Sequence, residues 1–161
     1  MFSKIQRTAF PPIKKPMMVW DGKCGFCRYW ISRWKSKTGN NIDYRTFQEV
    51  AEMYNDIPLK EFKKASRLIE TNGSIYSGPD SAFRSFNYFE KKDTRWHRWY
   101  TRYTWFTWLS DHSYNFIAKN RSLMFTLTKL CFGKNPKTIR PYWILWLLVL
   151  FAALYFLAQL L

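Results

Sequence analysis

The chain has 161 residues, with 26 Lys or Arg against 11 Asp or Glu, and 20% of its residues are aromatic. So many aromatic residues, with only 6 Gly and 7 Pro, exclude a disordered or fibrous chain, and three cysteines are too few for a disulfide scaffold. The net charge of +15 predicts an anionic neighbour, either a nucleic acid or a membrane surface.

The first third of the chain combines strand and helix patterns. Residues 1–15 predict a loose basic arm, and the apolar run at 17–20 predicts a buried strand that ends in a loop. From residue 25 to about 37, apolar side chains recur at helical spacing, which predicts a helix with one buried stripe. Alternation over 42–46 predicts a second strand, and 47–56 returns to a helical pattern.

A β-hairpin is the clearest local signal. The dipeptide Asn72-Gly73, flanked by SRLIE and SIYS, is preferred where a two-residue turn needs two positive φ angles. A helix is predicted over about 79–91. The resulting order of β-α-β, helix, β-β and helix is typical of an α/β domain with a thioredoxin-like (βαβ–ββα) sheet, which we place at residues 16–93.

The chemistry is expected where the first strand gives way to the first helix, in the segment DGKCGFC. A C-x-x-C pair within a βαβ unit is typical of redox proteins. Cys24 lies at the helix N-terminus, where free N–H groups favour a thiolate, and the neighbouring Lys23 adds positive charge. Because Cys27 begins the buried stripe, we expect Cys24 to be the solvent-reaching nucleophile and Cys27 the shielded resolving thiol.

The segment 21–27, following an apolar strand, resembles the signature of the DCC family of thiol–disulfide oxidoreductases. The block from Asp111 to Arg121 resembles the family's downstream D-x-x-Y-x-x-x-A-x-N-R pattern, and 78–82 resembles a further short family segment. The resemblance covers about residues 17–132. It implies a thioredoxin-like fold and protein-disulfide reductase-type activity, with Cys24 and Cys27 as the redox pair and Gly22 and Lys23 as supporting residues of the motif.

Two charged residues have roles that the sequence leaves open. Asp21 is predicted either to accept the proton of Cys27 or to cap the helix and brace the loop. Arg121 either stabilises a thiolate or mixed disulfide, or forms a structural ion pair with Asp21 or Asp111. The sequence does not decide between the two roles of either residue.

A zinc site is the main rival explanation for the two motif cysteines. Structural zinc usually takes four ligands, often as two spaced pairs, whereas the remaining candidates, Cys131, His97 and His112, are single and scattered. We therefore predict no metal site, and no bound cofactor because a cysteine pair carries its own electrons. Cys131 is either a buried apolar thiol or a juxtamembrane palmitoylation site.

Residues 94–134 predict a basic and aromatic helical extension. The stretch 95–112, taken as one helix, puts Arg95, Arg98 and Arg102 on one side and spreads its aromatic side chains around the rest. This pattern suits either single-stranded nucleic acid or a helix in the headgroup layer, and an adjacent membrane anchor favours the second. We therefore predict membrane lipid as a partner and no nucleic acid.

The segment 135–161 predicts a linker and a membrane anchor. Residues 142–161 carry no charge, and a helix of that length covers about 30 Å, the thickness of a bilayer core. The flank 122–141 has basic residues and no acidic one, which predicts that it stays on the cytoplasmic side. The N-terminus lacks the apolar region of a signal peptide, so the sequence predicts a single-pass protein with a C-terminal transmembrane anchor.

Together these features predict a thiol–disulfide oxidoreductase at the cytoplasmic face of a membrane. It would attack a protein or small-molecule disulfide through Cys24, resolve the mixed disulfide with Cys27, and take electrons from another thiol system. The alternative is a non-enzymatic, membrane-anchored interaction module whose cysteines are a redox switch or inert. The two hypotheses differ in whether Cys24 has a depressed pKa and can be reached by a substrate.

Overall fold

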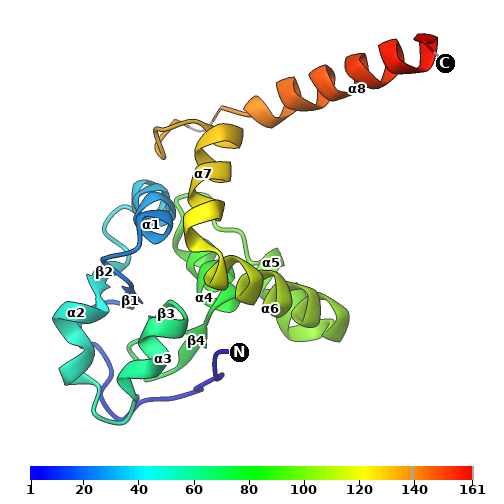
Figure 1. The fold of residues 1–161 in the computed structure, drawn as a ribbon. Helices are drawn as coiled ribbons and strands as arrows, with labels where there is room; N and C mark the ends of the chain where they lie inside the picture. The colour runs from blue at the N-terminus through cyan, green and yellow to red at the C-terminus, as the bar shows by residue number, and fades with distance from the viewer. Residues whose placement is uncertain (139, 161) are drawn as a thin grey trace.

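The computed structural model of the chain is an α/β fold built on a mixed four-stranded sheet (Figure 1). It describes residues 1–138 and 140–160, without the side chains of Leu154, Leu157 and Leu160. The strands lie in the order β2-β1-β3-β4; β1 pairs in parallel with β2 and antiparallel with β3, and β3 pairs antiparallel with β4. Their bounds are β1 (Met17–Trp20), β2 (Asp43–Thr46), β3 (Arg67–Ile69) and β4 (Ile75–Ser77).

Helices cover the sheet and continue beyond it as a second group, in which α7 lies beside α1 (Figure 1). In chain order, the helical segments are α1 (Gly25–Thr38), α2 (Phe47–Val50), the 3-10 turn η1 (Ala51–Met53), α3 (Leu59–Lys64), α4 (Pro79–Ser85), the 3-10 turn η2 (Phe86–Tyr88), α5 (Arg95–Arg102), α6 (Thr104–Lys119), α7 (Arg121–Phe132) and α8 (Tyr142–Leu160).

The core is divided between the two faces of the sheet because successive side chains of a strand point to opposite faces. Val19 packs in one cluster with Phe47 of α2, and Met18 packs in another with Ile31 of α1 and Leu68 of β3. Strand β1 is thus buried on both faces, which is why its sequence is a continuous apolar run rather than an alternating one.

The strands and helices predicted for the first half of the chain occur in the predicted order, with one unpredicted addition, α3 after Pro58, and two helices are shorter than expected. The helical pattern at 47–56 forms α2 and η1 only, because Val50 leaves the helical region at φ −124° and ψ −3°. The helix predicted over 79–91 ends at Ser85, whose hydroxyl donates to the carbonyl of Ala82 over 2.6 Å. Such local side-chain hydrogen bonds compete with continued helix.

The single helix predicted over 95–112 is wrong, because the chain breaks it at Tyr103. This residue is extended, with φ −110° and ψ 111°, and separates α5 from α6. Tyr100 of α5 is buried and its hydroxyl donates to the carboxylate of Asp111 over 2.6 Å, which fixes α5 against α6. The Thr107 hydroxyl of α6 also donates to the carbonyl of Tyr100, so side-chain hydrogen bonds join the two helices where continuous backbone pairing ends.

The N-terminal residues 1–15 pack along the domain rather than extending loosely from it. Phe2 is buried, and its ring lies so close to Gly78 that a Cβ on this glycine would be only 2.6 Å from the ring. The backbone N–H of Ile75 donates to the carbonyl of Gln6 over 2.8 Å, so the N-terminal segment covers the edge of β4.

The C-terminal helix α8 projects away from the rest of the molecule (Figure 1). Its described apolar side chains are exposed, including Leu148, Phe151 and Phe156. Over the side chains that the structure describes, no helix combines the length and the apolarity needed to cross a membrane. The span predicted at 142–161 stays a prediction, and Leu161 lies outside the described residues.

A buried arginine provides a test of the core. The guanidinium of Arg67 is fully buried and donates to Ser77 Oγ over 2.5 Å and to Glu61 Oε2 over 3.2 Å. Because Arg67→Met leaves the buried Glu61 carboxylate without this cation, we expect the free energy of unfolding to fall by about 3 kcal/mol. Urea denaturation of the reduced protein measures this change.

The matched control is Arg45→Met, which removes an arginine of an exposed ion pair with Asp43. Exposed substitutions of this kind change the free energy of unfolding by about 0.5 kcal/mol or less. Equal losses in the two variants would contradict the structural role given to Arg67.

Candidate active site

The loop between β1 and α1 brings the two motif cysteines to one helix end. Cys24 is the N-cap residue of α1, and its Sγ accepts a hydrogen bond from the backbone N–H of Cys27 over 3.1 Å. The backbone N–H of Cys24 donates to the carbonyl of Asp21 over 3.1 Å and closes the loop. Both cysteines are free thiols on the first turn of the helix.

The two thiols have opposite pKa shifts. The Cys27 side chain donates a hydrogen bond to Cys24 and stabilises its thiolate, as do the Cys27 backbone N–H and the charge of Arg121. Together these effects outweigh burial and lower the pKa of Cys24 to about 6. The hydrogen bond to Cys24, burial and the negative charge of Cys24 raise the pKa of Cys27 far above its ordinary value. At neutral pH the pair is therefore a Cys24 thiolate beside a protonated Cys27.

The exposure of the two cysteines is the reverse of the sequence expectation. Cys24 is buried, with 9% of its surface exposed, whereas Cys27 is only partly buried. Helix α7 packs on α1 at this point, so that a Cβ on Gly25 would lie 3.0 Å from the ring of Phe125. The sequence gives no sign of this cover, because α7 comes about a hundred residues later in the chain.

Asp21 and Arg121 form an ion pair beside the thiols, with 3.0 Å between Asp21 Oδ2 and Arg121 Nη1. The other carboxylate oxygen of Asp21 accepts from the backbone N–H of Lys23 over 3.1 Å and from Gln48 Nε2 over 2.9 Å. These contacts support the loop-bracing role of Asp21, and its role as proton acceptor stays a prediction. Asp111, the other candidate partner of Arg121, instead pairs with Lys4 over 2.6 Å.

The remaining motif residues shape the loop. A Cβ on Gly22 would lie 2.7 Å from Thr46 Cγ2, so only glycine lets the loop approach β2 this closely. The backbone N–H of Gly22 donates to Gln48 Oε1 over 3.1 Å, which makes Gln48 a second brace that the sequence analysis missed. Lys23 is exposed, and the cation that lowers the Cys24 pKa is Arg121.

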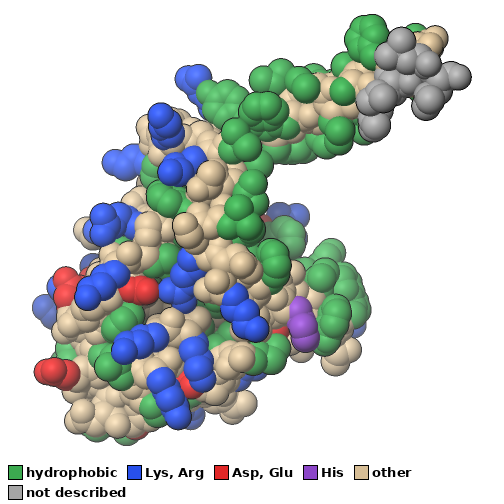
Figure 2. All heavy atoms as spheres, viewed as in Figure 1, with side chains coloured by type: hydrophobic (Ala, Val, Ile, Leu, Met, Phe, Trp, Pro, Cys, Tyr) green, Lys and Arg blue, Asp and Glu red, His purple; other side chains and the backbone are tan. Residues whose placement is uncertain are grey.

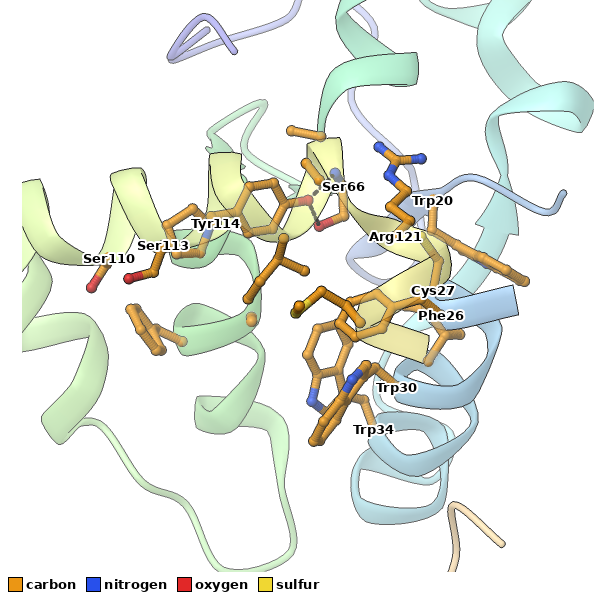
Figure 3. Close-up of a pocket in the computed structure, with 18 of the residues that line it drawn as sticks. Trp20, Phe26, Cys27, Trp30, Trp34, Ser66, Ser110, Ser113, Tyr114 and Arg121 are labelled. Carbon is orange, nitrogen blue, oxygen red and sulfur yellow. Dashed lines mark hydrogen bonds between the residues drawn. The ribbon is translucent and has the colours of Figure 1, made fainter. Parts of the chain in front are cut away.

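A cavity of about 620 Å³ opens beside the dithiol, between α1, α4, α6 and α7 (Figure 3). Figure 3 shows Cys27 and Trp30 of α1 facing the same space as Tyr114 of α6. Its walls are largely apolar, with many aromatic residues, and its lining residues include Trp20, Trp30, Phe83, Phe106, Tyr114 and Arg121. Of the two motif cysteines, only Cys27 belongs to this lining among the residues described.

The candidate zinc ligands do not converge. The imidazole of His97 lies 2.7 Å from Asp80, that of His112 lies 2.8 Å from the carbonyl of Trp108, and Cys131 is partly buried on α7. Within the described part of the chain, no three His, Cys, Asp or Glu side chains are grouped closely enough to hold a metal ion.

A thiolate and a protonated thiol on the first turn of the helix after β1 define a thiol–disulfide exchange site, and the α/β sheet is consistent with a thioredoxin-like fold. Residues 18–127 match the model of the DCC1-like thiol-disulfide oxidoreductase family, so the chain belongs to this family and is a thiol–disulfide oxidoreductase. The resemblance found in segment 21–27 is thereby confirmed. No curated protein and no solved structure matches the chain.

The pH dependence of Cys24 tests the origin of its low pKa. In a Cys131→Ser background, we expect the rate of alkylation by iodoacetamide to fall as the pH drops through about 6, because protonation removes the thiolate. Cys27→Ala removes the largest stabilising influence, so the midpoint should rise toward the ordinary thiol value of about 8.5. Alkylation rates across the pH range measure both midpoints.

Cys27→Ser is the matched control, because its hydroxyl keeps a hydrogen-bond donor at the same place. We expect its midpoint to lie between those of the parent and Cys27→Ala. A midpoint that stays near about 6 in Cys27→Ala would mean that the helix end and Arg121 lower the pKa without the second thiol.

Proposed function

We propose that the protein is a protein-disulfide reductase-type enzyme that exchanges disulfides through Cys24 and Cys27. The single observation that carries this proposal is the hydrogen bonding at Cys24, whose Sγ accepts from Cys27 N–H at the N-terminus of α1 and whose pKa is lowered to about 6. A thiolate at neutral pH is the form that attacks disulfides.

The proposed reaction has two exchange steps. The Cys24 thiolate attacks one sulfur of the substrate disulfide, forming a mixed disulfide and releasing the other substrate sulfur as a thiolate that takes up a proton. Cys27 then loses its proton and attacks Cys24 Sγ, forming the Cys24–Cys27 disulfide and releasing the reduced substrate. In this second step Cys24 Sγ is the sulfur attacked, and the substrate leaves as a thiolate that takes up a proton.

The cycle closes when an external thiol donor reduces the enzyme disulfide. The two cysteines hold both electrons between the half-reactions, so this exchange requires no bound cofactor. The substrate class we propose is a protein or small-molecule disulfide.

A trapping experiment tests the assignment of the two cysteines. In the full chain carrying Cys131→Ser, Cys27→Ser should accumulate a mixed disulfide at Cys24, because the resolving thiol is gone. Cys24→Ser should trap at least about tenfold less, because burial still raises the pKa of the remaining Cys27 thiol and keeps it protonated at neutral pH. Non-reducing electrophoresis and mass spectrometry with a disulfide-bonded substrate protein measure the adducts.

Equilibration of the parent with glutathione buffers is the companion measurement, and a reversible two-electron couple is expected. Equal trapping by the two variants would overturn the assignment of Cys24 as nucleophile. Thiols that stay unreactive in every variant would instead support the alternative of a non-enzymatic interaction module.

We also propose that helix α8 attaches the enzyme to a membrane, with the catalytic domain on the cytoplasmic side. Exposed apolar side chains run along α8, and exposed Trp105 and Trp108 add to the apolar surface over α6 (Figure 2). Exposed apolar surfaces of this extent mark interaction sites, and the net charge of +15 suits an anionic lipid surface. The basic residues that precede α8 support the cytoplasmic orientation.

Vesicle flotation tests this attachment. The full chain should float with vesicles of phosphatidylcholine and phosphatidylserine and remain bound in high salt, which screens purely electrostatic binding. The double variant Leu148→Glu/Phe151→Glu should lose at least about a hundredfold in partitioning, since each charge within a bilayer costs about 3 kcal/mol.

The matched control is Met53→Glu/Leu59→Glu, which places two charges at exposed apolar positions outside α8. We expect this control to float like the parent. Equal flotation of both double variants would contradict attachment through α8.

A further inference from the structure

The cavity beside Cys27 has the character of a binding site for an uncharged, apolar molecule. Its volume of about 620 Å³ is within the range of small-molecule sites, about 300–1,000 Å³. Trp20, Trp30 and Phe106 are among its aromatic walls, and aromatic faces favour planar rings. Its two charged lining residues, Asp21 and Arg121, are already paired with each other.

Tyr114 supplies a hydroxyl proton at the cavity wall. Ser81 Oγ donates to the carbonyl of Gly78 over 2.7 Å, so it accepts from Ser66 Oγ over 2.9 Å. Ser66 has then used its only hydroxyl proton, and Tyr114 must be the donor in the 3.3 Å contact between their hydroxyls (Figure 3). This contact is long for an O–H···O hydrogen bond, about 2.5–3.0 Å, so a ligand oxygen can compete for the proton.

Two further donors on residues of the cavity lining have no partner. The indole N–H groups of Trp20 and Trp30 are buried without a hydrogen-bond acceptor among the described residues. These two nitrogen atoms have almost no accessible surface, so Trp20 and Trp30 contribute apolar ring surface to the cavity and not hydrogen-bond donors. Among the described residues, the cavity therefore combines apolar walls with the Tyr114 hydroxyl and no unpaired charge, which suits a planar molecule carrying carbonyl oxygens.

We propose that this cavity binds a quinone, which accepts two electrons from the Cys24–Cys27 dithiol. The inference rests on the proposed function, because the dithiol must be redox-active for the quinone to be reduced. It adds an electron acceptor to the thiol and disulfide substrates. Glutathione fits the cavity poorly, since its two carboxylates would be buried without a free cation.

The position of Cys27 in the lining gives a balanced reaction. Cys27 Sγ adds to a ring carbon of the quinone, forming a C–S bond, while the thiol proton moves to one quinone oxygen. The Cys24 thiolate then attacks Cys27 Sγ; the S–S bond forms, and the C–S bond breaks with its electron pair left on the ring. The second oxygen takes a proton from solvent, and the quinone leaves as the hydroquinone.

This sequence uses both thiols in the states that the structure gives them. The buried Cys24 need not reach the cavity, because its attack is on the neighbouring sulfur. The accessible Cys27 makes the contact with the ligand. This reaction gives a chemical reason for Cys27 being more exposed than Cys24, which is the opposite of the sequence expectation.

The test uses the full chain with Cys131→Ser and decylubiquinone as the probe, without oxygen. We expect saturable oxidation of the dithiol, with one hydroquinone formed per disulfide, followed by absorbance and thiol titration. Ala82→Trp should reduce the quinone rate at least about tenfold by filling the cavity. Tyr114→Phe should weaken quinone binding about three- to tenfold by removing one donor.

Binding without chemistry is measured on Cys24→Ser/Cys27→Ser by quenching of tryptophan fluorescence, since Trp20 and Trp30 line the cavity. Ala9→Trp adds the same side chain at an exposed position and should leave the quinone rate unchanged. Each variant is also oxidised with glutathione disulfide, so that effects are expressed as the ratio of the quinone rate to the glutathione rate. Tyr114→Phe keeps the proposal testable if Ala82→Trp does not fold.

These experiments test quinone binding in the cavity separately from the thiol–disulfide exchange function. A dithiol that reacts with glutathione disulfide but not with the quinone, or a quinone rate that is not saturable, overturns the cavity proposal and leaves the exchange function intact. An equal quinone rate in the parent and in folded Ala82→Trp also overturns it. A dithiol that reacts with neither oxidant overturns the proposed function itself.

Discussion

The ion pair between Asp21 and Arg121 is the contact on which the site depends, because it joins two parts of the chain that lie 100 residues apart. Arg121 Nη2 also donates to the carbonyl of Lys63 over 2.9 Å, so one side chain ties the catalytic loop, α3 and α7 together. With α7 held there, Phe125 covers the end of α1 and the cavity gains a wall. The helical extension is therefore part of the active site, not an addition to the sheet domain.

The opposite pKa shifts of the two cysteines are determined by their positions at the helix end and not by burial. Burial raises the pKa of both thiols, yet the pKa of Cys24 is lowered, because it is the one that accepts hydrogen bonds from Cys27. The same hydrogen bond holds the proton on Cys27. The thiolate is thus formed on the buried residue, Cys24, and the proton is held on Cys27, the more exposed residue of the two.

Features set by neighbouring residues could be predicted from the sequence, and features set by distant ones could not. The buried strand, the helix after it and the hairpin at Asn72-Gly73 each have a local pattern. The sequence does not distinguish Asp21 from Asp111 as the partner of Arg121, because only the packing of α6 and α7 decides which carboxylate it meets. Gln48 carries no signal at all, since nothing distinguishes it from other polar residues until the loop lies beside it.

The large positive charge is set by composition, and the fold determines how it is distributed over the surface. The chain has only 11 acidic residues, and several of them are buried or half-buried against cations within the domain. These internal pairs are Glu61 with Arg67, Glu70 with Arg84, Asp111 with Lys4 and Asp21 with Arg121. Each pair removes one acidic and one basic group, so the net charge is unchanged while the remaining groups are more strongly dominated by Lys and Arg, many of which lie on the surface seen in Figure 2. A domain stabilised in this way presents its excess charge outward, and in the proposed membrane attachment this charge would meet an anionic surface while α8 would add an apolar contact that salt does not screen.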